Sequence, residues 1–341
     1  MRFLIKPLLE VEGLKKHFKV GNNLPWQKGP KSVKAVDGVN LNVYPGETLG
    51  IVGESGCGKS TVARLINQLV ESTEGKVKFN GKDITNMRTK ELRKERKNIQ
   101  MVFQDPFASL DPRMSVGELV SEPLKIHNVG DKNYRKNKAE EMLEIVGLNK
   151  NFASRNPHEF SGGQRQRINI ARTLVLEPEL VICDEPVSAL DVSVQAQIIN
   201  LLKKLQRELS LTLIFISHDL NVVRYMCERV LVMYLGKVVE VGSYKDIYSN
   251  PSHPYTKALL ASIPKESPFD KKESIVLKGS IPSPLNPPSG CRFHTRCPFA
   301  TEICKKSEPS LRSTEEMLEG HTAACHHIEK IKGEEGKLAY N

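Results

Sequence analysis

The chain has 341 residues, of which 39% are apolar, and its formal net charge is +10 at pH 7. This length accommodates one large domain, alone or with an appendage, and the apolar content is ordinary for a globular protein. The sequence contains no self-similar period and no long low-complexity tract, which argues against repeat architectures and disorder. The longest apolar run with strand character, Leu211–Ile216, is far shorter than the roughly 20 residues that a spanning helix needs.

The charge pattern and the start of the chain limit where the protein acts. Lys6 and Glu10 interrupt the first apolar run too early for a secretory signal, so we expect a cytosolic protein or one held at a membrane by partners. Two basic stretches, Arg88–Lys97 and Lys132–Lys138, could face nucleic acid or an anionic membrane surface. Glutamates alternate with the bases in the first stretch, as on a solvated helix face, so we do not expect nucleic acid as a partner.

A glycine-rich turn lies between an apolar strand, Thr48–Val52, and a helix expected to run to about Val70. The turn, Gly53-Glu54-Ser55-Gly56-Cys57-Gly58-Lys59-Ser60, fits the G-x-x-x-x-G-K-[ST] pattern. Glycines let successive backbone N–H groups point at phosphate oxygens, and the helix N-terminus adds positive potential. In such a loop the lysine contacts the β- and γ-phosphates and the final hydroxyl binds Mg²⁺. The pattern predicts a nucleoside triphosphatase without saying which kind.

The stretch from about residue 105 to 160 is helical, polar and interrupted by Pro106, Pro112 and Pro123, as expected of an inserted helical subdomain. Beyond it lie two more continuously apolar strands, Leu180–Cys183 and Leu211–Ile216. Such strands, separated by helical patterns, belong to a parallel sheet that is covered on both faces.

Two carboxylates follow the apolar strand Leu180–Cys183. Asp184 ends the strand, at the position of an aspartate that organises Mg²⁺. Glu185 comes directly after it and can polarise an attacking water, so we predict that it is the general base.

The segment Ser161-Gly162-Gly163-Gln164-Arg165-Gln166-Arg167 is a glycine turn before a helix. Ser161 can cap this helix, and the glycines let backbone amides approach an anion at its N-terminus. The segment resembles the signature motif of ABC ATPases, and it stands between the phosphate loop and the acidic strand end as in that family. The resemblance implies an α/β P-loop cassette with a RecA-like core and an inserted helical subdomain. It also implies that Ser161, Gly162, Gly163 and Gln164 close on ATP held by a second subunit.

The same resemblance implies roles for three further polar residues. Gln104, which follows the apolar run Ile99–Phe103, resembles the Q-loop glutamine that binds Mg²⁺ and the attacking water. His218 resembles the switch histidine that contacts the γ-phosphate, although a lone histidine after a strand is more often structural. Asp191, at the end of Ser188–Asp191, resembles the D-loop aspartate.

The base of the nucleotide is expected to stack on an aromatic side chain from an early strand. Phe18 lies in the expected strand Val11–Val20, and Trp26 in the following loop is the alternative. The complete predicted ATP-binding set is Phe18, Gly53, Glu54, Ser55, Gly56, Cys57, Gly58, Lys59, Ser60 and Thr61, with Ser60, Gln104 and Asp184 at Mg²⁺.

After Gly242 the chain becomes rich in proline, including Pro264 and Pro268. The segment Asn250–Leu260 resembles the one that follows the cassette in peptide-importer ATPases, a subfamily that includes nickel and glutathione importers. We therefore predict a nucleotide-binding domain over residues 1–250 and a small irregular C-terminal domain over residues 251–341.

Four cysteines crowd the C-terminal region, Cys291, Cys297, Cys304 and Cys325. A cluster in a cytosolic chain suggests a metal more than disulfides, and four thiolates suit a [4Fe–4S] cluster or a structural zinc. The spacing contains no C-x-x-C pair and resembles that of peptide-importer ATPases with an iron–sulfur cluster. Zinc, with His294, His321 or His326 replacing a cysteine, and metal-free thiols are the alternatives.

The resemblance covers residues 8 to about 328 and implies ATP hydrolysis coupled to import of oligopeptides or dipeptides. The implied partners are a second ABC ATPase, expected to be a paralogue, two transmembrane permeases and an extracytoplasmic peptide-binding protein. The chain would lie at the cytoplasmic face of the membrane. An importer of nickel, glutathione or another solute is the first alternative. A soluble ABC ATPase acting on ribosomes or DNA is another, but such translation factors usually carry two cassettes. Intact Glu185 and His218 argue against a regulator without turnover.

Overall fold

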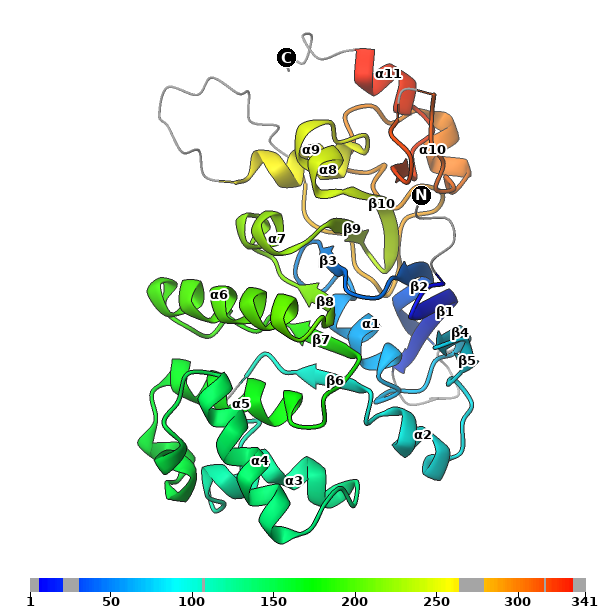
Figure 1. Cartoon of the computed structure of the whole chain (residues 1–341). Coiled ribbons are helices and arrows are strands. Elements are labelled where there is room, and N and C mark those ends of the chain that lie inside the picture. The colour runs from blue at the N-terminus through cyan, green and yellow to red at the C-terminus, as the bar shows by residue number, and fades with distance from the viewer. Residues whose placement is uncertain (1–5, 21–30, 106–107, 264–278, 316, 334–341) are drawn as a thin grey trace.

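The computed structural model describes residues 6–20, 31–105, 108–263, 279–315 and 317–333. Trp26, Pro106, Pro264 and Pro268, which entered the sequence analysis, lie outside these described residues. Two sheets occupy the middle of the molecule, helices α3 to α5 lie at one end, and the orange and red C-terminal segments lie at the other (Figure 1). This arrangement matches the predicted cassette with its helical subdomain and small C-terminal region.

The smaller sheet is antiparallel and has the order β2-β1-β4-β5. Its first strand confirms the strand predicted over Val11–Val20, extended by two residues at its start. Phe18 in β1, the residue predicted to stack on the base, pairs with Val33 in β2. The strands are β1 (Leu9–Val20), β2 (Lys31–Val43), β4 (Glu74–Phe79) and β5 (Lys82–Asp83).

The larger sheet has the order β11-β10-β9-β3-β8-β7-β6. The five strands from β9 to β6 are parallel, and every residue of β3, β7 and β8 is buried, which confirms the predicted parallel sheet covered on both faces. The antiparallel edge formed by β10 and β11 was not anticipated. The strands are β3 (Thr48–Val52), β6 (Ile99–Val102), β7 (Leu180–Asp184), β8 (Thr212–Ile216), β9 (Arg229–Tyr234), β10 (Lys237–Ser243) and β11 (Thr322–Ala323).

The helices around the sheets include one that is shorter than predicted. Helix α1 (Lys59–Ile66) was expected to reach about Val70, but Gln68 adopts a left-handed conformation with φ of 53° and breaks the helical path. Helix α2 (Thr89–Glu95) buries none of its residues, which confirms the solvated face expected for the first basic stretch. The others beside the sheets are α6 (Val192–Glu208) and α7 (Leu220–Met226).

The inserted subdomain is helical, as predicted, and its helix starts are defined by side-chain caps. Ser115 and Glu118 form a capping box at the start of α3, and Asp131 caps α4 by accepting from the N–H of Tyr134. The apolar faces pack around buried residues such as Leu143 and Ile170. The elements are α3 (Val116–Ile126), α4 (Lys132–Ile145), η1 (Lys150–Ser154), η2 (Pro157–Glu159) and α5 (Gly162–Leu174).

The C-terminal region packs onto the cassette. Strand β11 pairs with β10, and Tyr255 and Phe293 join the main hydrophobic cluster of the cassette. Its own small cluster comprises Met317, Ala323, Cys325, Ile328 and Ile331. Helix α8 (Tyr244–Ser249) directly precedes this region, whose own helices are α9 (Pro254–Ala261), α10 (Glu302–Lys306) and α11 (Ile328–Gly333). Across the described residues, no helix is both long enough and apolar enough to cross a membrane.

A buried carboxylate fastens this region to the sheet. Glu240 of β10 has no exposed surface and accepts hydrogen bonds from the N–H groups of Ser252 and His253 at 2.6 and 3.0 Å. Its Oε1 also lies 2.8 Å from Nε2 of the buried His321. Because a buried charge is costly without partners, these contacts hold the start of α9 and the segment before β11 against β10.

The neighbouring His253 makes this junction sensitive to acid. Its ring is buried, accepts from the N–H of Tyr255 at 3.1 Å, and contacts Phe293 with the ring centroids 5.7 Å apart. Burial lowers the pKa of His253 from its ordinary 6.5 to about 4. The unfolded chain therefore binds more protons than the folded chain between these two values, and stability must fall as the pH drops.

We expect the free energy of unfolding to lose about 3 kcal/mol through His253 between pH 6.5 and pH 4. Asparagine can keep the cap on the N–H of Tyr255 without titrating, so His253→Asn should show a smaller loss over this range. Urea unfolding of both proteins at several pH values measures the difference. Equal pH slopes for the two proteins would show that His253 does not contribute.

Candidate functional site

The glycine-rich turn between β3 and α1 is a tightly enclosed loop. Gly58 has φ of 109°, and a Cβ atom there would lie 2.2 Å from the carbonyl oxygen of Ala35. Gly53 has the same restriction, because its Cβ atom would lie 2.3 Å from the carbonyl oxygen of Met233. Only glycine fits at these positions, and the loop therefore keeps a path in which its backbone surrounds a small space.

Lys59 lies inside this loop and is only 4% exposed. Its Nζ donates to the carbonyl oxygens of Gly53 at 2.8 Å and Glu54 at 3.1 Å. A buried ammonium needs such acceptors. A bound phosphate could supply stronger, charged ones at the same atom.

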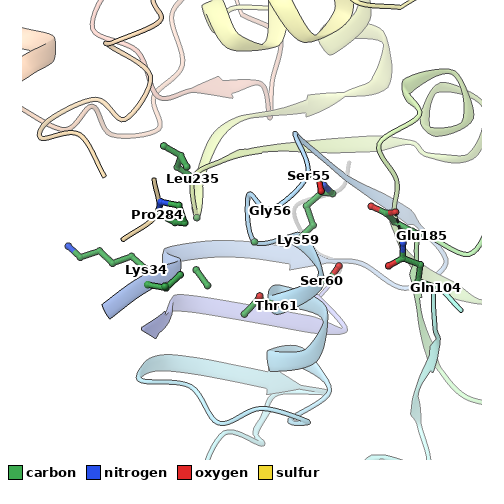
Figure 2. Close-up of a pocket in the computed structure, with 14 residues that line it drawn as sticks. Lys34, Ser55, Gly56, Lys59, Ser60, Thr61, Gln104, Glu185, Leu235 and Pro284 are labelled. Atoms are coloured by element: carbon green, nitrogen blue, oxygen red, sulfur yellow. Dashed lines mark hydrogen bonds between the residues drawn. The ribbon is translucent and has the colours of Figure 1, made fainter. Parts of the chain in front are cut away.

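A pocket of about 220 Å³ opens beside the loop. Figure 2 shows Gln104 and Glu185 pointing toward each other on one side of it, with Lys34, Leu235 and Pro284 on the other. The lining residues are Val33, Lys34, Ala35, Ser55, Gly56, Gly58, Lys59, Ser60, Thr61, Gln104, Glu185, Leu235, Gly236 and Pro284.

The oxygen ligands predicted for Mg²⁺ lie together. The hydroxyl of Ser60 donates to Oδ1 of Asp184 at 2.8 Å, which joins the start of α1 to the end of β7. Burial and the charge of Glu185 raise the pKa of Asp184, so a cation at this point would relieve unfavourable negative charge. Mg²⁺ bound with a nucleotide takes one or two protein oxygens and completes its shell with phosphates and water, so this pair fits the ion.

Glu185 is held by groups from two neighbouring strands. Its N–H donates to the carbonyl oxygen of Ile216, and its φ of 47° is unusual for a residue other than glycine. Its Oε2 accepts from Nε2 of Gln104 at 3.2 Å and lies 3.4 Å from Nδ1 of His218. The ends of β6, β7 and β8 thus bring together the three residues predicted to be catalytic.

Some of the predicted ATP-binding residues do not line the pocket. Gly53 is buried, Cys57 belongs to the hydrophobic core, and the carboxylate of Glu54 pairs with Arg296. Phe18 lies next to the pocket through its partner Val33, and the residue is 40% exposed. Its role as the base-stacking residue stays a prediction.

The signature segment begins α5 as expected. Ser161 accepts from the N–H of Gln164, and Gln164 accepts from the N–H of Ser161, forming a capping box. A Cβ atom on Gly163 would lie 2.4 Å from Val194 at the start of α6, so this glycine permits close packing of the two helices. Asp191 precedes α6 and is exposed. Ser161, Gly162, Gly163 and Gln164 are not among the residues that line the pocket of their own chain.

Sequence reasoning missed one wall of the pocket. Lys34 and Ala35 of β2 and Leu235 and Gly236 of the β9–β10 turn come from segments without a recognisable pattern. Pro284 of the C-terminal region completes this wall, and its carbonyl oxygen accepts from the N–H of Lys34 at 3.2 Å. Because Pro284 lies in a proline-rich stretch, nothing in the sequence indicates that it lines the pocket.

The four cysteines of the C-terminal region are free thiols, of which Cys304 and Cys325 are buried and Cys291 and Cys297 are partly buried. Burial raises the pKa of Cys297 to about 12, and charge on the other three thiols raises it as well. The N–H of His327 donates to the sulfur of Cys325 at 3.3 Å, and the backbone at Phe293 and Phe299 partly offsets the raised pKa of Cys291 and Cys297. Such N–H donors favour thiolates and are found around iron–sulfur clusters.

The histidines considered as zinc ligands are engaged elsewhere. His321 contacts Glu240, His294 bonds to the carbonyl oxygen of Cys291, and His326 bonds to that of Ser307. Within the described part of the chain, no group of three or more His, Cys, Asp or Glu side chains is arranged to hold a metal ion. The arrangement of these side chains therefore supports neither the predicted cluster on the four cysteines nor a zinc site in which a histidine replaces a cysteine.

Comparison with known families gives two matches in separate parts of the chain. Residues 36–188 match the ABC transporter family, and residues 239–304 match the family described as oligopeptide/dipeptide transporter, C-terminal region.

Individual proteins resemble the chain over nearly its whole length. The oligopeptide transport ATP-binding protein AppF of Bacillus subtilis is 55% identical over 94% of this chain and 97% of its own. The oligopeptide transport ATP-binding protein OppF of Salmonella typhimurium is 53% identical over 96% of this chain and 98% of its own. Among solved structures, the ATP-binding cassette MJ0796, in a dimer bound to ADP and Pi, has a TM-score of 0.62 at 33% identity. It covers 69% of this chain and 98% of its own.

The two glycines of the loop should respond differently to alanine. Gly58→Ala places a Cβ atom against Ala35 and should destabilise the fold by several kcal/mol, because both the φ angle and the backbone contact are unfavourable. Gly56→Ala is the matched control, since Gly56 also has a positive φ but faces open space, and it should cost only about 1–2 kcal/mol. Denaturant unfolding compares them, and equal losses would contradict the enclosed geometry.

Proposed function

Since the chain belongs to the ABC transporter ATP-binding family, as an oligopeptide-type member, we propose that it hydrolyses ATP to power import of oligopeptides or dipeptides across the cytoplasmic membrane. The observation that carries the hydrolytic part is the contact of Glu185 with both Gln104 and His218 beside the loop of Lys59. The peptide part is supported by relatives named for oligopeptide transport, whose sequences match this chain from the cassette through the C-terminal region.

We assign the roles within the site as follows. Lys59 and the N–H groups of the loop bind the β- and γ-phosphates, and Phe18 stacks on the base. Ser60, Gln104 and Asp184 would hold Mg²⁺, which would supply positive charge to balance the phosphates. Glu185 accepts a proton from the attacking water, while Gln104 and His218 orient that water against the γ-phosphate.

The site is completed by a second subunit in this proposal. Ser161, Gly162, Gly163 and Gln164 act on ATP bound by a partner ATPase, with Asp191 near the junction. The dimeric state in which the related cassette MJ0796 was solved supports such an arrangement. The partner is a paralogue, and the pair works at the cytoplasmic face of the membrane with two permeases and an extracytoplasmic peptide-binding protein.

We propose the predicted division of the chain, with residues 1–250 as the nucleotide-binding domain and 105–160 as its helical subdomain. Residues 251–341 form the C-terminal domain. Pairing of β11 with β10 supports a C-terminal domain that is attached firmly to the cassette rather than tethered by a free linker.

Glu185→Gln tests the hydrolytic role and the transport role together. The variant keeps the size of the side chain and loses its basicity, so the protein should bind ATP normally and hydrolyse it at least about 100-fold more slowly. In cells that lack the gene, the wild-type chain should restore uptake of a labelled oligopeptide and Glu185→Gln should not.

The exposed Glu208→Gln on α6 is the matched control and should behave like the wild type. Near wild-type hydrolysis by Glu185→Gln, measured with the second ATPase present, would exclude Glu185 as the base. Normal peptide uptake in the deletion strain would exclude the proposed substrate class.

We also propose that Cys291, Cys297, Cys304 and Cys325 hold a [4Fe–4S] cluster. The proposal rests on the number and spacing of the four cysteines, because no group of described His, Cys, Asp or Glu side chains is arranged to hold a metal ion. The N–H of His327 donates to the sulfur of Cys325 at 3.3 Å, a contact that favours a thiolate at this position. Such a group would fix a region that has only a small hydrophobic cluster of its own, since metal–ligand bonds can supply folding free energy.

Protein purified without oxygen should accordingly be brown and contain about four iron atoms per chain. Cys297→Ser should remove the colour, while ATP binding should survive because these cysteines do not line the pocket. The buried Cys183 on β7 is the matched control, and Cys183→Ser should keep the iron. A colourless anaerobic protein with four alkylatable thiols in that region would contradict the proposal.

A further inference from the structure

Two arginines of the C-terminal region reach carboxylates of the cassette. Arg292 pairs with Asp37 of β2 and also donates to the carbonyl oxygen of Leu235. Arg296, four residues later, pairs with Glu54 inside the glycine-rich loop. Both contacts join positions more than 200 residues apart in the sequence.

The ion pair between Arg296 and Glu54 is bidentate. The Nη1 atom lies 3.0 Å from Oε2 of Glu54, and Nη2 lies 3.2 Å from Oε1. The side chain of Arg296 is 8% exposed and that of Glu54 is 23% exposed, so water screens the pair less than it screens a surface ion pair. The hydroxyl of Tyr234 gives Nη1 a further partner at 3.4 Å.

The backbone of Glu54 is held from the same side. Its N–H donates to the hydroxyl of Tyr255 in α9 at 2.8 Å, and Tyr255 is buried. Its carbonyl oxygen accepts from Lys59 at 3.1 Å. The C-terminal region thus fixes one residue of the loop through both its N–H group and its side chain, directly before the pocket-lining Ser55 and Gly56.

A carboxylate in this loop is a liability for a site that must receive a triphosphate, because like charges repel in a partly buried setting. The guanidinium of Arg296 neutralises that charge and draws the side chain toward the C-terminal region. We propose that Arg296 is a positioning residue of the ATP site, which acts through Glu54 to hold the loop open to phosphate and makes the C-terminal domain a part of nucleotide binding. This inference rests on the proposed ATP-binding function.

The test is a double-mutant cycle on the full-length chain, read out by titration with a fluorescent ATP analogue and Mg²⁺. Arg296→Met leaves the Glu54 charge unpaired and should raise the Kd by about tenfold, whereas Glu54→Gln should change it by less than about threefold. The double variant E54Q/R296M has no charge to neutralise and should bind within about threefold of the wild type. A purely structural role of Arg296 would not give this recovery.

Arg312→Met is the matched control, because Arg312 also pairs with a carboxylate in the C-terminal region, Glu329, and should leave the Kd unchanged. Arg296→Lys keeps the charge but loses the bidentate contact, so its Kd should lie between those of R296M and the wild type. Unchanged binding by R296M, or equal weakness of R296M and E54Q/R296M, would overturn the proposal. A wild-type chain that does not bind ATP would instead overturn the proposed function and, with it, this role of Arg296.

Discussion

The buried ammonium of Lys59 sets the conditions that the rest of the site must meet. A charge with 4% exposure is tolerated only where acceptors surround it, and here the acceptors are carbonyl oxygens of Gly53 and Glu54. Those carbonyls face inward only because the loop follows a path open to glycine at Gly53 and Gly58. The same path leaves room for phosphate beside the lysine. One loop conformation therefore both satisfies the buried charge of Lys59 and creates the space in which an anion can bind.

The parallel sheet adds the chemistry to this loop. Strands β6, β7 and β8 are neighbours, so the residues that follow them meet at one edge. Glu185 takes a left-handed conformation there that few residues other than glycine adopt, and it contacts side chains from the two flanking strands. Sparsely populated backbone conformations persist where the surrounding structure enforces them, and they are concentrated at functional sites. The edge of the sheet therefore fixes the carboxylate of Glu185, as the glycine-rich loop fixes the ammonium of Lys59.

The C-terminal region is bound to this arrangement by groups that would be costly to bury alone. Glu240 anchors it to β10 through His321 and the start of α9, and Arg296 and Tyr255 connect it to Glu54. Each contact pairs a buried or partly buried polar group of one segment with a polar group of the other, and so each segment would leave polar groups unpaired without its partner. The C-terminal region, which the sequence predicts to be an irregular appendage, therefore supports the conformation of the glycine-rich loop.

The sequence by itself determined the local chemistry. The glycine-rich turn at 53–58, the continuous apolar strands and the helix cap of Ser161 depend on backbone geometry within a few residues, and each was found as predicted. Only the tertiary structure decided that Pro284 lines the pocket, that Arg296 meets Glu54, and that β11 extends the sheet. These contacts join segments about 80 to 250 residues apart, and a single proline or arginine leaves no periodic pattern in the chain. These contacts depend on how the whole polypeptide packs, and they cannot be predicted from the sequence of any single segment.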